Sequence, residues 1–277
     1  MKKIIVPVDF SLHSENALKT AAFLAKQTGA EVVAVHMLEL SNAVISQSES
    51  YIQQEMLFYL KLTEKKFTDF LQKDYLSDIK VTPVVKHFKI FSELDKLARE
   101  ENADLIVMGS KGVEGLKEMF IGSNTEKVIR YAHTPVLVIK EKPITQKIEK
   151  VIFACDFSDD DVKPYIRAKD FFKKLGCNIE LVYISTPTSK FRSTQQLEEK
   201  MLRFFYQADE SEEHMKNVKI ISDFSVEKGI FYYADKVNSD VLVVATHGRK
   251  GISHFFEGSI SEDIANHSEL PVMSFKI

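Results

Sequence analysis

Short continuous runs of apolar residues alternate along the chain with longer segments in which apolar residues recur at helical spacing. Such runs, without polar alternation, are typical of parallel strands that are buried on both faces. Strand, helix and strand within about forty residues predict βαβ units, for which a right-handed parallel arrangement is the default. The runs in the first half of the chain predict strands at Lys3–Val8, Glu31–Leu38, Ile79–Val85, Leu105–Met108 and Val136–Ile139.

The helical segments between these runs carry their apolar residues on one face. In the first helix, Ser14 is the predicted N-cap and Gly29 the predicted C-terminal stop. A polar loop and a long helix are expected within 41–75, and a further helix follows Ser92. These segments place helices between all the predicted strands.

The second half of the chain repeats this pattern. Asp9-Phe10-Ser11 at the end of the first strand returns, 147 residues later, as Asp156-Phe157-Ser158. The charged segment 140–150 contains a proline and is interpreted as a linker. The sequence therefore predicts two tandem α/β domains, 1–142 and 148–277, each an open parallel five-stranded sheet with helices on both faces. The corresponding strands are expected at Val151–Cys155, Asn178–Ile184, Val218–Ile221, 240–245 and Val272–Phe275.

A loop with glycines follows the fourth strand of the first half. Gly109, Lys111 and Gly112 come directly after the strand, and nine residues later Gly122 and Ser123 open a helix. Glycine lets the backbone approach an anion, and a helix N-terminus attracts negative charge. The serine hydroxyl adds a donor and the lysine a positive charge. The loop indicates a phosphate site, and the structural alternative is a turn followed by a serine-capped helix.

The second half keeps this loop with changes. Gly248, Gly258 and Ser259 stand 136 residues after their counterparts, a spacing that chance does not preserve. Ala245 replaces the first glycine, and Ala154 replaces the proline of the first strand. A methyl group at position 245 is expected to narrow the space for phosphate and to penalise positive φ. The second site is therefore the weaker candidate.

The loop and its two flanking strands, DLIVM at 104–108 and PVLVI at 135–139, resemble the universal stress protein family. The resemblance covers essentially the whole chain as two fused copies. It implies a Rossmann-like fold of the adenine nucleotide α-hydrolase type. It also implies that ATP, AMP or ADP binds, with or without Mg²⁺, in a non-catalytic stress-response or regulatory role.

The resemblance assigns roles to individual residues outside the glycines. Pro7 shapes the turn after the first strand, Asp9 contacts the nucleotide, and Met37 lies against the adenine. Asn124 belongs to the same site at the helix start, and Asp156 is the acidic residue of the second copy. From the residues alone, the carboxylate of Asp9 suits a ribose hydroxyl, the adenine amino group or a metal, and capping of the following helix is the alternative.

The composition of the chain disfavours several classes of binding partner. The net charge is −3 and the pI is near 6.3, so no basic field favours nucleic acid or an anionic membrane. Cys155 and Cys177 belong to no CxxC motif and are interpreted as small buried residues. The apolar run at the N-terminus is too short for a signal-peptide core, and no segment approaches the length of a membrane span. We expect a cytoplasmic protein.

Two other functions stay open from the sequence. The chain has no P-loop, no SGGxDS loop and no G-x-S-x-G elbow, which disfavours an enzyme. Slow Mg²⁺-dependent ATP hydrolysis through Asp9 and Lys111 is one alternative, and a nucleotide-free scaffold is the other. The resemblance also implies that the final strands of the two copies pair as an intramolecular pseudo-dimer, with a further homodimer as an additional arrangement.

Overall fold

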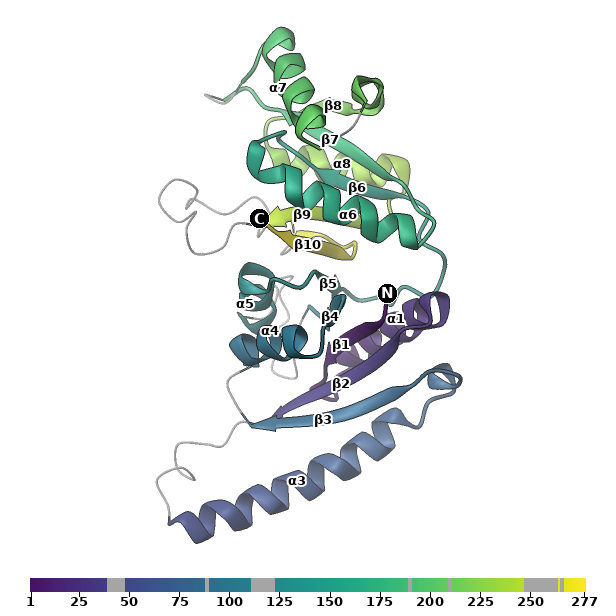
Figure 1. Cartoon of the computed structure of the whole chain (residues 1–277), viewed down its shortest axis with the longest axis vertical. Coiled ribbons are helices and arrows are strands. Elements are labelled where there is room, and N and C mark those ends of the chain that lie inside the picture. Colours follow the sequence, from purple (N-terminus) through teal and green to yellow (C-terminus); the bar gives the residue numbers. More distant parts are fainter. Residues whose placement is uncertain are drawn as a thin grey trace. The chain divides into compact units, whose positions relative to one another are not determined.

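The computed structural model describes residues 1–38, 48–87, 90–110, 123–188, 191–208, 211–246, 264 and 267–277 (Figure 1). The chain divides into two compact units, of which the first holds most of residues 1–145. The second holds residues 146–277 together with Ile129–Leu137. Below, residues 1–142 are called copy one and residues 148–277 copy two, after the repeat in the sequence.

Copy one contributes strands in the order β3-β2-β1-β4-β5. The pairings of β1 with β2 and β4, and of β2 with β3, are parallel. Ile4, at the centre of this arrangement, is fully buried and lies opposite both Val32 and Leu105. The apolar runs form strands because both of their faces are covered. Their bounds are β1 (Lys3–Pro7), β2 (Glu31–Leu38), β3 (Val81–His87), β4 (Leu105–Gly109) and β5 (Val136–Ile139).

The helices of copy one follow the predicted apolar faces, with one correction. Ser11, rather than Ser14, is the N-cap of the first helix, because its side chain accepts a hydrogen bond from the Ser14 backbone N–H. Gly29 is confirmed as the C-cap, with a φ of 70°. The elements are α1 (Leu12–Thr28), α3 (Glu49–Leu71), the 3₁₀ turn η1 (Asp74–Leu76), α4 (Ile90–Glu100) and α5 (Ser123–Tyr131).

Only the C-terminal part of the long helix α3 is buried. Thr63, Phe67 and Phe70 face the protein, whereas Leu57 and Phe58 are exposed. The helix lies along β3, the last strand in the order of copy one (Figure 1). The packed end of α3 contacts Phe10, in the turn after β1, through Phe67 and Phe70.

Copy two repeats the topology with the order β10-β9-β6-β7-β8, and its described pairings are all parallel. In Figure 1, α6 lies on the near side of these strands and α8 behind them. The predicted tandem α/β fold is confirmed. The strands are β6 (Val151–Ala154), β7 (Ile179–Ser185), β8 (Lys219–Ser222), β9 (Val241–Thr246) and β10 (Val272–Lys276). The helices and 3₁₀ turns are η2 (Asp159–Asp161), α6 (Val162–Lys174), α7 (Thr194–Gln207), η3 (Glu212–Asn217) and α8 (Val226–Val237).

The second copy begins its first helix differently from the first. In α1 the helix starts at Leu12, whereas the equivalent position in copy two, Asp159, starts the 3₁₀ turn η2, and α6 follows from Val162. Ser158 caps this turn through a reciprocal pair of hydrogen bonds with Asp161. Among the described residues, no helix has the length and apolar character needed to cross a membrane.

Candidate functional site

The carboxyl ends of β1 and β4 reach the same edge of the sheet in copy one. These strands are parallel neighbours, with Ile4 opposite Leu105 and Ile5 opposite Ile106. The chain runs outward from β1 through β2 to β3 and then returns to β4 on the other side of β1. Open α/β sheets bind ligands at such a reversal of strand order, beyond the carboxyl ends of the strands. Asp9 and Gly109 stand at this edge.

Asp9 builds the turn that leads into α1. Its Oδ1 accepts hydrogen bonds from the Ser11 backbone N–H at 3.0 Å and from the Ser11 hydroxyl at 2.6 Å. The Ser11 hydroxyl oxygen in turn accepts the backbone N–H of Ser14 at 3.2 Å. Asp9 therefore acts on the helix start through Ser11 and does not itself cap the helix.

Phe10, next to this carboxylate, is held in a left-handed backbone conformation with a φ of 66°. Its ring packs on His36, Phe67 and Phe70, with centroid distances of 4.7, 5.2 and 5.5 Å. His36 donates its Nδ1–H to the carbonyl of Val8 at 2.7 Å. Burial lowers the pKa of His36, although this hydrogen bond acts in the opposite direction. The aromatic cluster fixes the turn that carries Asp9.

Gly109 is required by a close contact with α1. A Cβ atom at this position would lie 2.8 Å from both the carbonyl carbon and the carbonyl oxygen of His13. The φ of Gly109 lies outside the left-handed region, so the requirement is steric. The Gly109 carbonyl accepts the Thr125 hydroxyl at 3.0 Å, and the Ser110 N–H donates to the Ile139 carbonyl at 2.9 Å. The first turn of α5 is thereby tied to the end of β4.

The remaining predicted residues of copy one fall at this edge or outside the described residues. Pro7 is the last residue of β1, opposite Val35, and Met37 lies near the end of β2, half-buried. Ser123 is the first residue of α5 and Asn124 is exposed in its first turn. Lys111, Gly112, Gly122 and the side chain of Ser123 lie outside the part of the chain that the structure describes.

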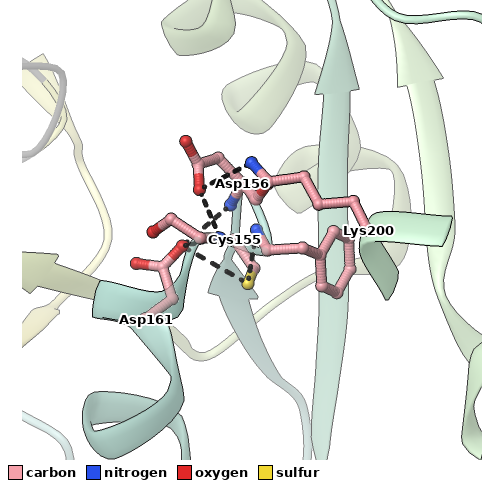
Figure 2. Close-up of polar contacts among 6 residues, drawn as sticks. Cys155, Asp156, Asp161 and Lys200 are labelled. Carbon is pink, nitrogen blue, oxygen red and sulfur yellow. Dashed lines mark hydrogen bonds and ion pairs between the residues drawn. The ribbon is translucent and has the colours of Figure 1, made fainter. Parts of the chain in front are cut away.

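In copy two, a lysine of the chain contacts the strand-end carboxylate. Figure 2 shows Lys200, from α7, reaching Asp156 at the end of β6. Its Nζ donates to the backbone carbonyl of Asp156 and lies 3.4 Å from Oδ1 of the same residue. Asp156 Oδ1 also accepts the Ser158 N–H at 2.7 Å, as Asp9 accepts that of Ser11. The Asp156 carboxylate therefore has the same place in the turn as Asp9 and, in addition, forms an ion pair with Lys200.

A second carboxylate lies beneath this pair. Asp161 is buried, and its Oδ2 accepts the backbone N–H of Asp156 at 3.2 Å (Figure 2). Burial and the negative charge of Asp156 raise the pKa of Asp161 to about 6. For Asp156, partial burial acts upward, but hydrogen bonding from Asp161 and the charge of Lys200 outweigh it and hold the pKa below its usual range. When the two carboxyl groups share one proton, it therefore resides on Asp161, and Asp156 is ionised.

Both cysteines are free and buried, as the sequence predicted. The Sγ of Cys155 accepts the backbone N–H of Phe157 at 3.3 Å and lies 3.7 Å from Oδ2 of Asp161. Burial raises the pKa of the Cys155 thiol well above its usual value. The thiol is therefore protonated and unreactive at neutral pH.

Of the other predicted positions of copy two, some are described by the structure and some lie outside the described residues. Ala154 ends β6 opposite Val182, and Ala245 lies in β9 opposite Phe275. Gly248, Gly258 and Ser259 lie outside the described residues. The alanine at 245 coincides with the different start of the first helix in copy two, where η2 takes the place of the first turn of α1.

Sequence reasoning missed three residues that shape the two edges. His13 explains the glycine at 109, and Lys200 and Asp161 explain the environment of Asp156. Asp161 carried a local signal, because it stands three residues after Ser158 in a capping-box pattern. For His13 and Lys200 the sequence carries no such signal, since their contacts depend on how helices pack on distant strands.

Both copies have a Rossmann-like α/β fold with a parallel sheet. The model of the universal stress protein family matches residues 1–140 and again residues 147–276. The chain therefore belongs to the universal stress protein family, with two copies in tandem. The sequence-based resemblance is confirmed.

Individual relatives agree with this assignment. Universal stress protein MJ0531 of Methanocaldococcus jannaschii is 33% identical over 147 residues, which cover 50% of this chain and 82% of the relative. Universal stress protein MJ0577 of the same organism is 32% identical over 156 residues, covering 51% of this chain and 96% of the relative. A universal stress protein structure from Archaeoglobus fulgidus has a TM-score of 0.64, with 99% of this chain and 96% of that chain covered. Its 21% identity supports a shared fold.

Proposed function

We propose that copy one binds an adenine nucleotide, ATP or its AMP or ADP relatives, in a non-catalytic stress-response or regulatory role. The observation that carries this proposal is the tie between Thr125 and the carbonyl of Gly109 at 3.0 Å. It holds the N-terminus of α5 beside the end of β4, the neighbour of the strand that carries Asp9. Free backbone N–H groups and a positive dipole end suit a phosphate chain, and an acceptor carboxylate suits the nucleoside.

The roles of the residues follow from this arrangement and from the family. The first amides of α5, with Ser123, face the phosphates, and Asp9 accepts from the ribose or the adenine amino group. Met37, near the end of β2, contacts the adenine ring. A Mg²⁺ ion, if it accompanies the nucleotide, would neutralise phosphate charge and take oxygen ligands such as the Asp9 carboxylate. Lys111, Gly112 and Gly122 complete the loop.

Copy two is the weaker nucleotide site in this proposal. Its strand-end carboxylate already pairs with Lys200, so a nucleotide would have to displace the ammonium group before it could use Asp156. The binding free energy of the nucleotide would be reduced by the loss of the ion pair between Lys200 and Asp156. Copy one thus takes the nucleotide, and copy two contributes mainly as the other half of the molecule.

Binding is tested by titrating the full chain with ATP in a calorimeter, and by releasing small molecules from the purified protein with acid and identifying them. Gly122→Val is expected to weaken binding by about tenfold or more, because a branched side chain blocks the backbone approach to phosphate. The matched variant in copy two, Gly258→Val, is expected to change affinity about twofold at most. Equal losses would show that the two sites are ranked wrongly.

A second matched pair tests the carboxylate. Asp9→Asn is expected to weaken ATP binding more than Asp156→Asn, since Asp156 is already paired with Lys200. If millimolar ATP produces no heat and acid releases no nucleotide, the nucleotide-binding proposal is wrong. Release of inorganic phosphate over hours would instead identify the chain as a slow hydrolase.

A further inference from the structure

A cleft of about 590 Å³ opens in copy two at the amino-terminal ends of its strands, whereas Asp156 follows the carboxyl end of β6. It lies between α6, η3 and the first residues of β7 and β8. A volume of this size is within the range of small-molecule sites. The cleft is formed entirely by described residues of the second unit.

Three lysines give the cleft a positive rim. Lys169 and Lys173 lie one turn apart on α6, and Lys219 begins β8. The one carboxylate among the lining residues, Glu180, is already engaged by the Tyr233 hydroxyl at 2.8 Å and by Lys219 at 3.5 Å. Because the whole chain has a net charge of −3, this local excess of cations is a departure from the rest of the molecule.

Apolar and aromatic side chains form part of the lining of the cleft, beside polar ones. Tyr165 of α6, Leu181 of β7 and Phe205 of α7 are all buried and line it. The ring of Phe205 lies 6.2 Å from that of His214 on η3, which also lines the cleft. A lining that combines these apolar side chains with lysines complements a ligand that has a flat apolar body and an anionic group.

In copy one, the region of α1 that corresponds to the cleft is covered by the protein. The positions equivalent to Tyr165 and Lys169 are Leu18 and Ala22 of α1, which are fully buried. Smaller apolar residues there allow the neighbouring segment to pack directly against the helix. The cleft is therefore not a general consequence of the shared fold.

The closing segment is the 3₁₀ turn η1, which packs against α1. Lys73, just before η1, pairs with Glu15 at 3.4 Å, and the ammonium of Lys19 lies 5.6 Å from the ring centroid of Tyr75. In copy two, the corresponding turn η3 packs against α7. This different packing leaves the α6 side open.

We propose that this cleft is a second binding site, for a small molecule with a ring-sized apolar body and a phosphate or carboxylate group. Lys169, Lys173 and Lys219 bind the anionic group, and Tyr165 and Phe205 contact the ring. The site is distinct from the proposed nucleotide edge, which belongs to copy one, and within copy two it lies at the ends of the strands opposite to Asp156. Neither the family assignment nor nucleotide binding by copy one is needed for it.

Pyridoxal 5′-phosphate is a suitable probe because it combines a ring, a phosphate and an aldehyde. The aldehyde condenses with a lysine amine to give an imine and water, and borohydride then adds hydride to form a stable secondary amine. At a substoichiometric dose, peptide mapping is expected to find the label first on Lys169, Lys173 or Lys219. Inorganic phosphate should protect these lysines, and pyridoxal without phosphate should label them less. Labelling spread over the exposed lysines without protection would overturn the proposal.

Matched variants separate the cleft from general surface charge. Lys169→Gln with Lys173→Gln is expected to weaken reversible binding of the probe about tenfold, measured by equilibrium dialysis without borohydride. Lys163→Gln with Lys174→Gln, on the same helix but outside the cleft, removes the same charge and should change binding less than about twofold. Equal losses in both double variants would refute the site. Gly122→Val should leave probe binding unchanged, so failure of the nucleotide proposal and failure of this one are distinguishable.

Discussion

Phe10 and Phe157 stand 147 residues apart in sequence and share a left-handed backbone conformation, with φ values of 66° and 60°. Residues other than glycine adopt this conformation at a cost of roughly 1–2 kcal/mol. In each copy, aromatic packing on the ring offsets that cost: Phe67 contacts Phe10, and Phe204 contacts Phe157, each with a centroid distance of 5.2 Å. The turn places an aspartate at the end of the first strand in both copies.

Phe67→Ala is expected to destabilise the protein by about 3–4 kcal/mol, because the side chain is buried and its removal leaves a cavity beneath Phe10. Phe58→Ala, on the same helix but 62% exposed, should change stability by less than about 1 kcal/mol. Urea unfolding of both variants provides the measurement. Similar losses for the two would contradict the role assigned to the packed end of α3.

Gly109→Ala is expected to cost about 1–3 kcal/mol, because the new methyl group would overlap the main chain of His13. The reverse change at the equivalent position, Ala245→Gly, should cost at most about 1 kcal/mol, the usual penalty of glycine in a strand. Thermal unfolding of the two variants compares them. A tolerated alanine at 109 would show that α1 can move away from β4 without loss.

Lys200→Met is expected to raise the pKa of Asp156, because the ammonium group that lowers it is removed. Stability should change by less than about 1 kcal/mol, since the Asp156 side chain is 66% exposed. Carboxyl-carbon NMR titrations measure the pKa, and Lys216→Met on η3 provides a control of equal charge. An unchanged pKa would mean that the ion pair does not persist in solution.

Asp161→Asn is expected to alter the pH dependence of stability. The folded pKa of about 6 lies above the ordinary value of 3.8, so the folded state binds the proton more tightly. The stabilisation from Asp161 is therefore present at pH 4 and is lost as the pH rises through 6. Relative to Asp161→Asn, the parent chain should lose about 1–2 kcal/mol between pH 4.5 and pH 7.5 in urea unfolding. An identical difference at both pH values would contradict the raised pKa.

The duplicated α/β fold was predictable because its signals are local. Continuous apolar runs such as Leu105–Met108 are buried strands in the structure, and Gly29 ends α1 as the C-cap pattern indicated. The prediction of Ser14 as the N-cap was wrong, because Ser11 caps the helix. Both residues are serines, and the hydrogen bonds from Ser11 to Asp9 hold Ser11 at the position that caps the helix.

The candidate site was predictable only in part. The sequence placed the start of α5 at Ser123, which is where the helix begins. It gave no indication that Lys200 would reach Asp156 or that His13 would press against Gly109, because these contacts join elements whose packing is set by the whole core. The glycine at 109 was interpreted through phosphate alone, whereas helix packing already requires it.

The contact between Gly109 and His13 also limits how the halves of this chain could be recombined. A chimaera that receives the first helix of copy one in place of the α6 region of copy two would bring a full helical turn against position 245, where the parent chain has alanine. The methyl group would have to be removed along with the exchange. The start of the first helix and the residue at position 109 or 245, about a hundred positions away, must therefore be exchanged together. We expect the two copies to have diverged at both of these places jointly.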